Sequence, residues 1–434
     1  MSPLLAPLFA QLISLQVGDR TEARYVKQSD ERFEGSTSPV VALRLTDPRT
    51  TFALAYAPSL SLIPLERKPR ELYVFHFVSA NATYRLFKPT TLSLNTSLGI
   101  GSLNFRVLGV QGQPTPTGAD GTTTNPPASG TPTNGAPTNG APTSGAPTSG
   151  APTNGASGMV TPAGVTRPDV SDKKVRYYTF SSSAGVAQQL TKAWGVTAQA
   201  GTLWASGRDG ESRRLYPPLR GWFLGVGTGY TYALTARDSF ATNVGLLKSW
   251  SSEGNESATL NGSESWAHRF TLRTVGSLSA GLNITRFSMR DGLRGFSVFP
   301  AFSVGISHSE RLGRGTLSVA ANAFSAPTLE PLRALVDPRV GAGGSIGYSR
   351  GNLGLSASGS SAFSIAPSEH DAGAVSAYNG DVRASYLLTK LTQIDGGARL
   401  VRQTYQENEV IPITWVAYVG LSFGYVTPLV GKGK

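Results

Sequence analysis

The sequence predicts an all-β fold, namely a transmembrane antiparallel up-and-down β-barrel of about 18 strands with one long disordered extracellular loop. Three observations predict it. Alternation of period two recurs over long segments, without a convincing amphipathic helix. Short turns alternate with longer polar connections. Finally, one parity of the strands is apolar, whereas the other is small or polar.

The strands come first, because their length separates membrane barrels from soluble sheets. Soluble strands have about 5–6 residues, whereas a tilted membrane strand needs ~9–11. Many of the expected strands reach the greater length. They fall near 14–27, 38–46, 51–63, 71–86, 91–108, 174–190, 195–205, 221–235, 239–250, 260–272, 276–288, 295–309, 315–326, 338–349, 352–365, 374–388, 391–405 and 411–426.

The connections between these strands alternate in length. Tight turns such as Lys88-Pro89 and Thr389-Lys390 follow every second strand. The longer polar loops are expected at Lys27–Ser38, Pro64–Glu71, Ser206–Gly221, Ser251–Ser265, Met289–Gly295, Ala326–Pro338, Ala366–Gly373 and Gln406–Pro412. Outer-membrane barrels have short periplasmic turns and long extracellular loops, so an even strand count places both termini on the periplasmic side.

The two faces of the strands differ in polarity. Leu92, Leu94 and Leu98 lie on one parity of the segment 91–108, and serine, asparagine and glycine lie on the other. A soluble sandwich would bury the apolar parity and expose a large, weakly charged face. A water-filled barrel instead turns the apolar parity to lipid.

Aromatic residues are expected to form two girdles at the membrane surfaces. The first set lies near the short turns, and the second lies nearer the long loops. The turn-side set is Tyr84, Trp194, Phe240, Phe270, Tyr348, Tyr386, Phe423 and Tyr425. The loop-side set is Trp204, Trp222, Trp250, Trp266 and Trp415.

The domain organisation is one barrel over residues 14–434 behind an N-terminal segment, 1–13, which is short, apolar and a candidate signal-peptide remnant. The barrel is interrupted at 111–172 by a low-complexity loop built on repeated Gly-Ala-Pro-Thr-Asn/Ser units. This composition is typical of a disordered segment that is partly in the polyproline-II conformation. A glycosylated or ligand-binding stalk is the functional alternative.

Composition excludes several classes of function. The net charge is +12, but the basic residues are scattered rather than clustered, so nucleic acid is not expected as a partner. Cysteine is absent, which excludes disulfides and thiolate chemistry. The sequence contains no apolar run of about 18 residues, so it predicts no transmembrane helix.

Charged residues on the inward parity are the candidate functional residues. An arginine-rich lumen would favour anions. The same charges could instead form cross-strand ion pairs that brace the wall, and the sequence leaves both readings open. The candidates are Arg20, Glu22, Arg24, Arg44, Arg85, Arg269, Asp381, Arg383, Asp395 and Arg399. A possible constriction loop adds Arg208, Arg213, Arg214 and Arg220.

We expect no enzyme, cofactor or metal site. The histidines are His76, His268, His308 and His370, and none has triad spacing. His76 and His268 fall on the lipid-side parity near the loop ends, and His268 is the one candidate for lipase-like chemistry. Glu369, His370 and Asp371 could bind a cation weakly, but a solvated loop is the simpler reading.

The chain resembles bacterial outer-membrane β-barrels of porin-like size. The stretch Ile413–Tyr425, within the last predicted strand, is similar to the aromatic-ended strand that the barrel-assembly machinery recognises, although nine residues follow this stretch. The resemblance implies a Gram-negative outer membrane, contact with lipid and lipopolysaccharide, and possible periplasmic export partners. A looser analogy is with the barrels of exopolysaccharide secretion in myxobacteria.

Two functions fit this fold. The first is a pore for transport or export of polar, anionic solutes, or of a polymer such as a polysaccharide. The alternative is a structural or adhesion barrel that anchors surface loops and interacts with envelope or extracellular partners. The glycine-rich stretch Gly341–Ala362 is a candidate subunit-contact wall, although glycines also simply bend barrels.

Overall fold

The computed structural model describes residues 12–27, 31–65, 68–104, 174–191, 193–215, 217–232, 237–290, 292–330, 335–364, 374–405 and 413–430. The predicted low-complexity loop at 111–172 and most of the N-terminal segment lie outside these residues, as do Glu369, His370 and Asp371.

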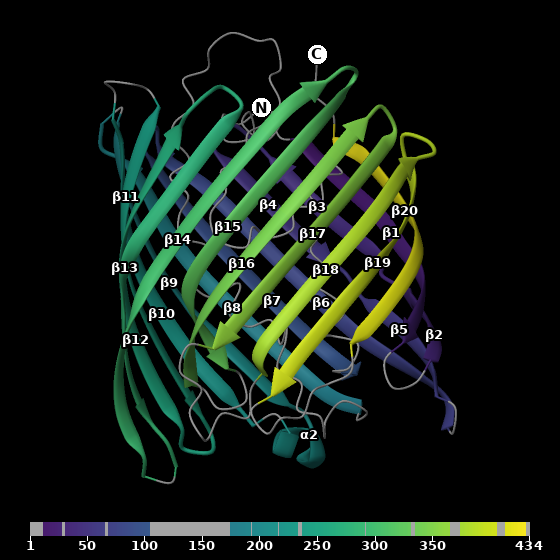
Figure 1. Cartoon of the computed structure of the whole chain (residues 1–434), viewed down its shortest axis with the longest axis horizontal. Helices are drawn as coiled ribbons and strands as arrows, with labels where there is room; N and C mark the ends of the chain where they lie inside the picture. Colours follow the sequence, from purple (N-terminus) through teal and green to yellow (C-terminus); the bar gives the residue numbers. More distant parts are fainter. Residues whose placement is uncertain are drawn as a thin grey trace, which may run out of the picture.

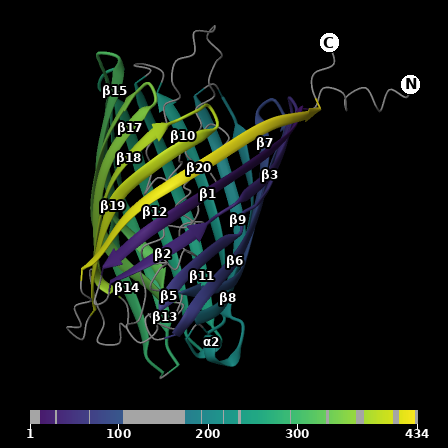
Figure 2. The same ribbon diagram turned by 90° about the vertical axis from the view of Figure 1, so that its right-hand side faces the viewer.

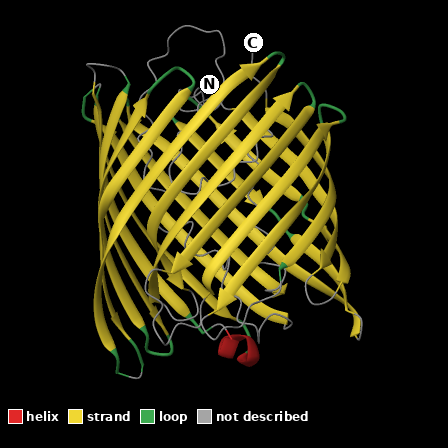
Figure 3. Ribbon diagram, in the orientation of Figure 1, coloured by secondary structure: helices red, strands yellow, loops and turns green. Residues whose placement is uncertain are grey.

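The described chain is almost entirely β-strand, with one short helix (Figure 1; Figure 3). The strands are β1 (Leu12–Lys27), β2 (Glu31–Thr37), β3 (Val40–Thr46), β4 (Thr50–Tyr56), β5 (Ser59–Leu65), β6 (Lys68–Phe87), β7 (Thr90–Asn104), β8 (Lys174–Gln189), β9 (Trp194–Gly207), β10 (Leu219–Tyr232), β11 (Asp238–Ser251), β12 (Glu256–Arg269), β13 (Thr274–Ser288), β14 (Arg294–Leu312), β15 (Gly315–Glu330), β16 (Leu335–Arg350), β17 (Leu353–Ser364), β18 (Ala374–Leu387), β19 (Thr392–Tyr405) and β20 (Thr414–Val430). Helix α2 spans Gly210–Leu215.

Consecutive strands pair antiparallel around the sheet, and the last strand returns to the first. β1 pairs with β20 from Ile13 opposite Val430 to Lys27 opposite Trp415. The sheet therefore closes on itself and has no free edge, as a membrane-spanning sheet must. Figure 2 shows β20 and β1 side by side along the closure.

Two prolines explain why twenty strand segments make a barrel of eighteen strands. β2 and β3 form one barrel strand interrupted at Pro39, and β4 and β5 form another interrupted at Pro58. The pairing register is the same on both sides of each interruption. Proline has no N–H group, so the ladder loses hydrogen bonds there without changing its register. The predicted strand number is confirmed.

The outward parity carries large apolar side chains along most strands. Val298, Val382 and Val419 are 54%, 59% and 53% exposed, although they lie inside long strands. The parity that faces the lumen carries serine, glycine, threonine and the charged residues described below. The two faces are therefore arranged as in a membrane barrel, with the apolar face outside.

Close strand approach requires glycine on part of the inner wall. A Cβ on Gly281 would lie 2.0 Å from the carbonyl oxygen of Gly262, and one on Gly101 would lie 2.1 Å from that of Val74. Neither position can accept a side chain without a backbone shift.

The predicted difference between turns and loops is only partly correct. Several predicted loops are instead strand extensions, because polar residues beyond the apolar band continue to pair. β2 occupies much of the predicted loop Lys27–Ser38, and β12 begins at Glu256, inside the predicted loop Ser251–Ser265. Accordingly Trp266 pairs with Phe240 at the short-turn end, so its assignment to the loop-side girdle was wrong. The same correction applies to His268.

No helix among the described residues is long and apolar enough to span a membrane.

Candidate functional site

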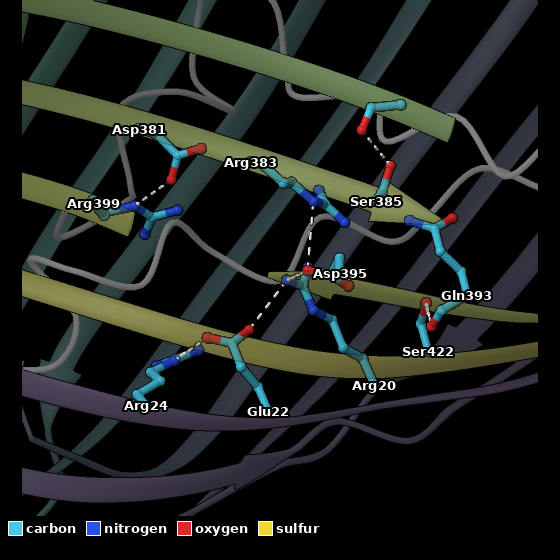
Figure 4. A network of polar contacts seen from close by, with 11 residues as sticks. Arg20, Glu22, Arg24, Asp381, Arg383, Ser385, Gln393, Asp395, Arg399 and Ser422 are labelled. Atoms are coloured by element: carbon cyan, nitrogen blue, oxygen red, sulfur yellow. Dashed lines mark hydrogen bonds and ion pairs between the residues drawn. The ribbon is translucent and has the colours of Figure 1, made fainter. Parts of the chain in front are cut away.

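A network of charged side chains crosses the inner wall on β18, β19 and β1 (Figure 4). Its centre is Asp395 on β19, whose side chain is fully buried. The guanidinium of Arg20 donates to Asp395 Oδ2 over 3.0 Å, and Arg383 Nε lies 3.4 Å from the same oxygen. Two arginines from different strands thus share one carboxylate.

Glu22 extends the network along β1. Its carboxylate lies 3.1 Å from the Arg20 guanidinium and also accepts a short hydrogen bond from Arg24. Arg20, Glu22 and Arg24 share the inward parity of one strand, so the alternation of β1 aligns them without a turn or bulge.

A second ion pair joins β18 to β19. Arg399 Nε donates to Asp381 Oδ2 over 3.2 Å, and the two residues are directly opposite in the register. The Tyr418 ring lies over Gly397 on the same wall, because a Cβ at Gly397 would be 2.8 Å from the Tyr418 hydroxyl oxygen. The aromatic ring fills the space that the glycine leaves.

Gly420 allows Arg20 to reach across an intervening strand. The register aligns Asp395 on β19, Gly420 on β20 and Glu22 on β1 in one row. A Cβ on Gly420 would lie 3.5 Å from Asp395 Oδ1, so a larger side chain would occupy the path between the two neighbouring strands.

The network has four arginines and three carboxylates, a formal charge of +1, and spare hydrogen-bonding capacity. Arg20 Nε, Arg383 Nε and Asp395 Oδ1 are buried, and no described residue forms a hydrogen bond with them. Arg383 Nε is near enough to Asp395 to form an ion pair, but the geometry is not that of a hydrogen bond. Buried polar atoms without partners are uncommon in folded proteins, and here they lie at the centre of the network.

The other three lumen candidates, Arg44, Arg85 and Arg269, lie apart from this network. Each is exposed and has the inward parity. They lie within two residues of the short-turn ends of β3, β6 and β12, respectively. Arg311 has the same position on β14 and was missed, although its parity with Ser307 and Ser309 could have revealed it. None of these four arginines forms an ion pair with a described residue; we call them the turn-end arginines.

The predicted constriction loop folds at the opposite end of the barrel. Asp209 precedes helix α2 and accepts a hydrogen bond of 2.7 Å from the backbone N–H of Ser212, which lowers the pKa of Asp209. Helix α2 follows β9 at the loop end (Figure 3). Its residues Arg213 and Arg214, and the preceding Arg208, are exposed.

Arg220 does not face the lumen. Its guanidinium lies 5.2 Å from the centre of the Trp204 ring, and the two residues are directly opposite on β10 and β9. Trp204 belongs to the exposed outward parity, so Arg220 is a cation–π partner of the loop-side aromatic girdle.

The three described histidines lie on the outer face and bind neighbouring polar groups. His76 Nδ1 is 2.7 Å from the Tyr56 hydroxyl, and His308 Nδ1 is 2.8 Å from the Thr274 hydroxyl. His268 Nδ1 is 2.7 Å from Asp238 Oδ1. Within the described ranges, no group of three or more His, Cys, Asp and Glu side chains could hold a metal ion.

Neither a protein-family model nor a curated protein matches this sequence. Solved structures similar to it include the outer membrane protein OpdK from Pseudomonas aeruginosa, with 10% identity, coverage of 96% of this chain and 99% of that chain, and a TM-score of 0.45. OccK3 (OpdO) of the same organism has 14% identity, coverage of 98% and 100%, and a TM-score of 0.43.

A third similar structure is OccK2 (OpdF) from Pseudomonas aeruginosa, which was solved in complex with glucuronate. It shares 12% identity over 96% of this chain and 98% of that chain, with a TM-score of 0.42. These values are too low to carry a function from those proteins to this chain.

Proposed function

We propose that this protein is an outer-membrane pore that conducts small polar solutes and prefers anions. The observation that carries the proposal is the inner wall of a closed barrel lined by excess arginine. The central network contributes a formal charge of +1, and the four turn-end arginines add positive charge without a described carboxylate partner. Barrels of 16–18 strands are wide enough for an aqueous channel.

The turn-end arginines are exposed and form no ion pair with a described residue, so their positive charge is available to passing ions. At about 10 Å in water, each positive charge would attract a passing monovalent anion by about 0.4 kcal/mol. Screening over one Debye length, about 10 Å at 0.1 M salt, reduces this energy to about 0.15 kcal/mol. Four such charges would attract an anion by about 0.6 kcal/mol and repel a cation by as much, which together correspond to about a tenfold preference for an anion over a cation. The effect is long-ranged, so it requires no specific contact.

The orientation and partners belong to the same proposal. We place the short-turn end and both termini in the periplasm, the loop end with α2 outside, and lipid and lipopolysaccharide against the apolar wall. The barrel-assembly machinery would recognise the aromatic residues Phe423 and Tyr425, which face outward on β20 before the strand ends at Val430.

The test is ion selectivity in a planar bilayer under a salt gradient. The native barrel is expected to give a reversal potential of the anion-selective sign. Replacing Arg44, Arg85, Arg269 and Arg311 together by Gln should reduce the anion-to-cation permeability ratio about tenfold. Arg220→Gln is the matched control, because Arg220 faces outward and should leave the ratio unchanged.

Two results would contradict the proposal. A folded barrel that conducts no ions would favour the structural or adhesion alternative. If the native protein and the quadruple Gln variant have the same ion selectivity, the turn-end arginines do not determine selectivity. Blockade by dextran sulfate, but not by neutral dextran, would extend the solute class to acidic polysaccharide.

A further inference from the structure

The barrel wall contains a local gap in its hydrogen-bond ladder, between the strand β2–β3 and the strand β4–β5. Thr37 pairs with Leu60 on one side of the gap, and Val41 pairs with Tyr56 on the other. The common register of these two pairs places Pro39 directly opposite Pro58. Both prolines lie near the middle of their strands, so the gap lies at the middle of the wall.

The hydrogen bonds of the neighbouring residues show which way the proline carbonyl groups point. Ser38 exchanges hydrogen bonds with Arg20 on β1, and the Ala57 N–H donates to the Phe77 carbonyl oxygen on β6. Successive residues of a strand direct their N–H and C=O groups to opposite sides. The carbonyl groups of Pro39 and Pro58 therefore face each other across the gap, where neither residue supplies an N–H group.

The gap removes one hydrogen-bonded pair from the ladder. The flanking pairs are four residues apart, about 13 Å at 3.3 Å per residue, whereas successive hydrogen-bonded pairs of an intact antiparallel ladder are two residues, about 7 Å, apart. Within this length the two strands share no ladder hydrogen bond, and two carbonyl oxygens need another donor. Backbone groups without partners are strongly disfavoured in hydrocarbon.

A carboxylate lies on the outer face beside the gap. Asp19, at the middle of β1, has the outward parity of Val17 and is opposite Phe423 in the register. Its two carboxylate oxygens accept hydrogen bonds from Thr21, at 3.0 Å, and Thr37, at 2.8 Å. An ionisable residue at membrane depth is uncommon and usually has a function.

These two independent features require the same surroundings. Asp19 and the two proline carbonyl groups are all hydrogen-bond acceptors, and a carboxylate has sites for further donors beyond the two threonine hydroxyls. A dry hydrocarbon layer offers no donors to them. Water from the lumen, or a donor-rich head group, satisfies both features at once.

We propose that this seam, between β2–β3 and β4–β5, is a lateral opening between the lumen and the membrane. Its ligand would be an amphiphile with a cationic or hydrogen-bond-donating head group, which Asp19 and the proline carbonyl groups would bind while the apolar tail lies along the outer wall. This route runs through the wall, so it is independent of ion conduction along the lumen.

The absence of cysteine allows a direct test of hydration. Leu60→Cys places a thiol on the outer face next to the seam, and Leu98→Cys places one on the outer face at the middle of β7, where the ladder is continuous. In nanodiscs, a membrane-impermeant maleimide should label the thiol at position 60 at least ten times faster. Adding Pro39→Val and Pro58→Val, which restore both N–H groups, should remove the difference. Equal labelling of the two thiols would overturn the proposal.

Binding is tested with dodecylammonium and dodecyl sulfate, each carrying a spin label that quenches a fluorophore attached at position 60. The ammonium should quench at concentrations about tenfold lower than the sulfate, and Asp19→Asn should abolish this preference. The isosteric change preserves the fold, which heat-modifiable gel migration checks. No preference, or one that Asp19→Asn leaves intact, would contradict the assigned head-group chemistry.

Passage is tested by closing the seam. Ser38→Cys with Ser59→Cys should form a disulfide across it, because the register places the two side chains opposite each other on the inner face. Oxidation should stop transfer of the dodecylammonium probe from the lumen to the bilayer, and reduction should restore it. The control pair, Ser97→Cys with Ser181→Cys, crosses a continuous ladder and should have no effect. Undiminished transfer through the oxidised seam would exclude the lateral route.

Discussion

Arginine side chains have different surroundings in the central network and among the turn-end arginines. In the central network, Arg20 and Arg383 share the buried carboxylate of Asp395. Among the turn-end arginines, Arg44 and Arg85 are exposed and have no ion pair with a described residue. The comparison teaches that inward parity alone does not define a role. Burial and partner choice divide one predicted set into a buried, paired group and an exposed, unpaired group, and we propose that the first braces the wall and the second acts on solutes.

The largest effect should come from Asp395→Asn. The change removes the charge at the centre of the network and leaves Arg20 and Arg383 without their shared partner. Removing one member of a buried ion pair costs about 3–5 kcal/mol, and the partial exposure of both arginines reduces the expected loss to about 2–3 kcal/mol. Urea unfolding of the barrel in lipid vesicles measures it.

Arg85→Gln is the control for this prediction, because Arg85 is an exposed turn-end arginine. It should change the free energy of unfolding by less than about 0.5 kcal/mol, as exposed substitutions usually do. If Asp395→Asn were no less stable than Arg85→Gln, the energetic distinction between the two groups would disappear.

A smaller loss of stability should follow Gly420→Val. The added side chain would enter the path by which Arg20 crosses β20 to Asp395, since even a Cβ lies 3.5 Å from the Asp395 carboxylate. Overpacking of this kind costs about 1–3 kcal/mol. The matched control is Gly424→Val on the same strand, where an added Cβ meets nothing within 4 Å.

A double-mutant cycle makes the Gly420 experiment specific. In the Asp395→Asn background, Gly420→Val should cost less than in the native protein, because the interaction that it disturbs is already weakened. Equal costs in both backgrounds would mean that Gly420 acts on the backbone pairing rather than on the network.

The sequence predicted which face of a strand each residue lies on better than it predicted which residues of distant segments contact each other. The alternation around Arg383 and Arg399 placed them on the inner wall, because side-chain direction in a strand is local. That Arg20 meets Asp395 depends on the closure of β1 onto β20, and the two residues are 375 positions apart. Likewise Pro39 and Pro58 are visible in the sequence, but their opposition depends on the register. Loop lengths were overestimated where polar alternation continued beyond the apolar band, as in β12.

The smallest and most easily reversed difference should be the response to salt. Raising the ionic strength from 0.1 M to 1 M shortens the Debye length from about 10 Å to about 3 Å, which screens exposed charges far more than buried pairs. The native protein and the variant with Arg44, Arg85, Arg269 and Arg311 all replaced by Gln should therefore differ less in anion preference at high salt. The unfolding difference between the native protein and Asp395→Asn should persist, because Asp395 is inaccessible to ions. A parallel decline of both quantities would show that the central network is as hydrated as the turn-end arginines, and the distinction between a bracing group and an exposed group would then disappear.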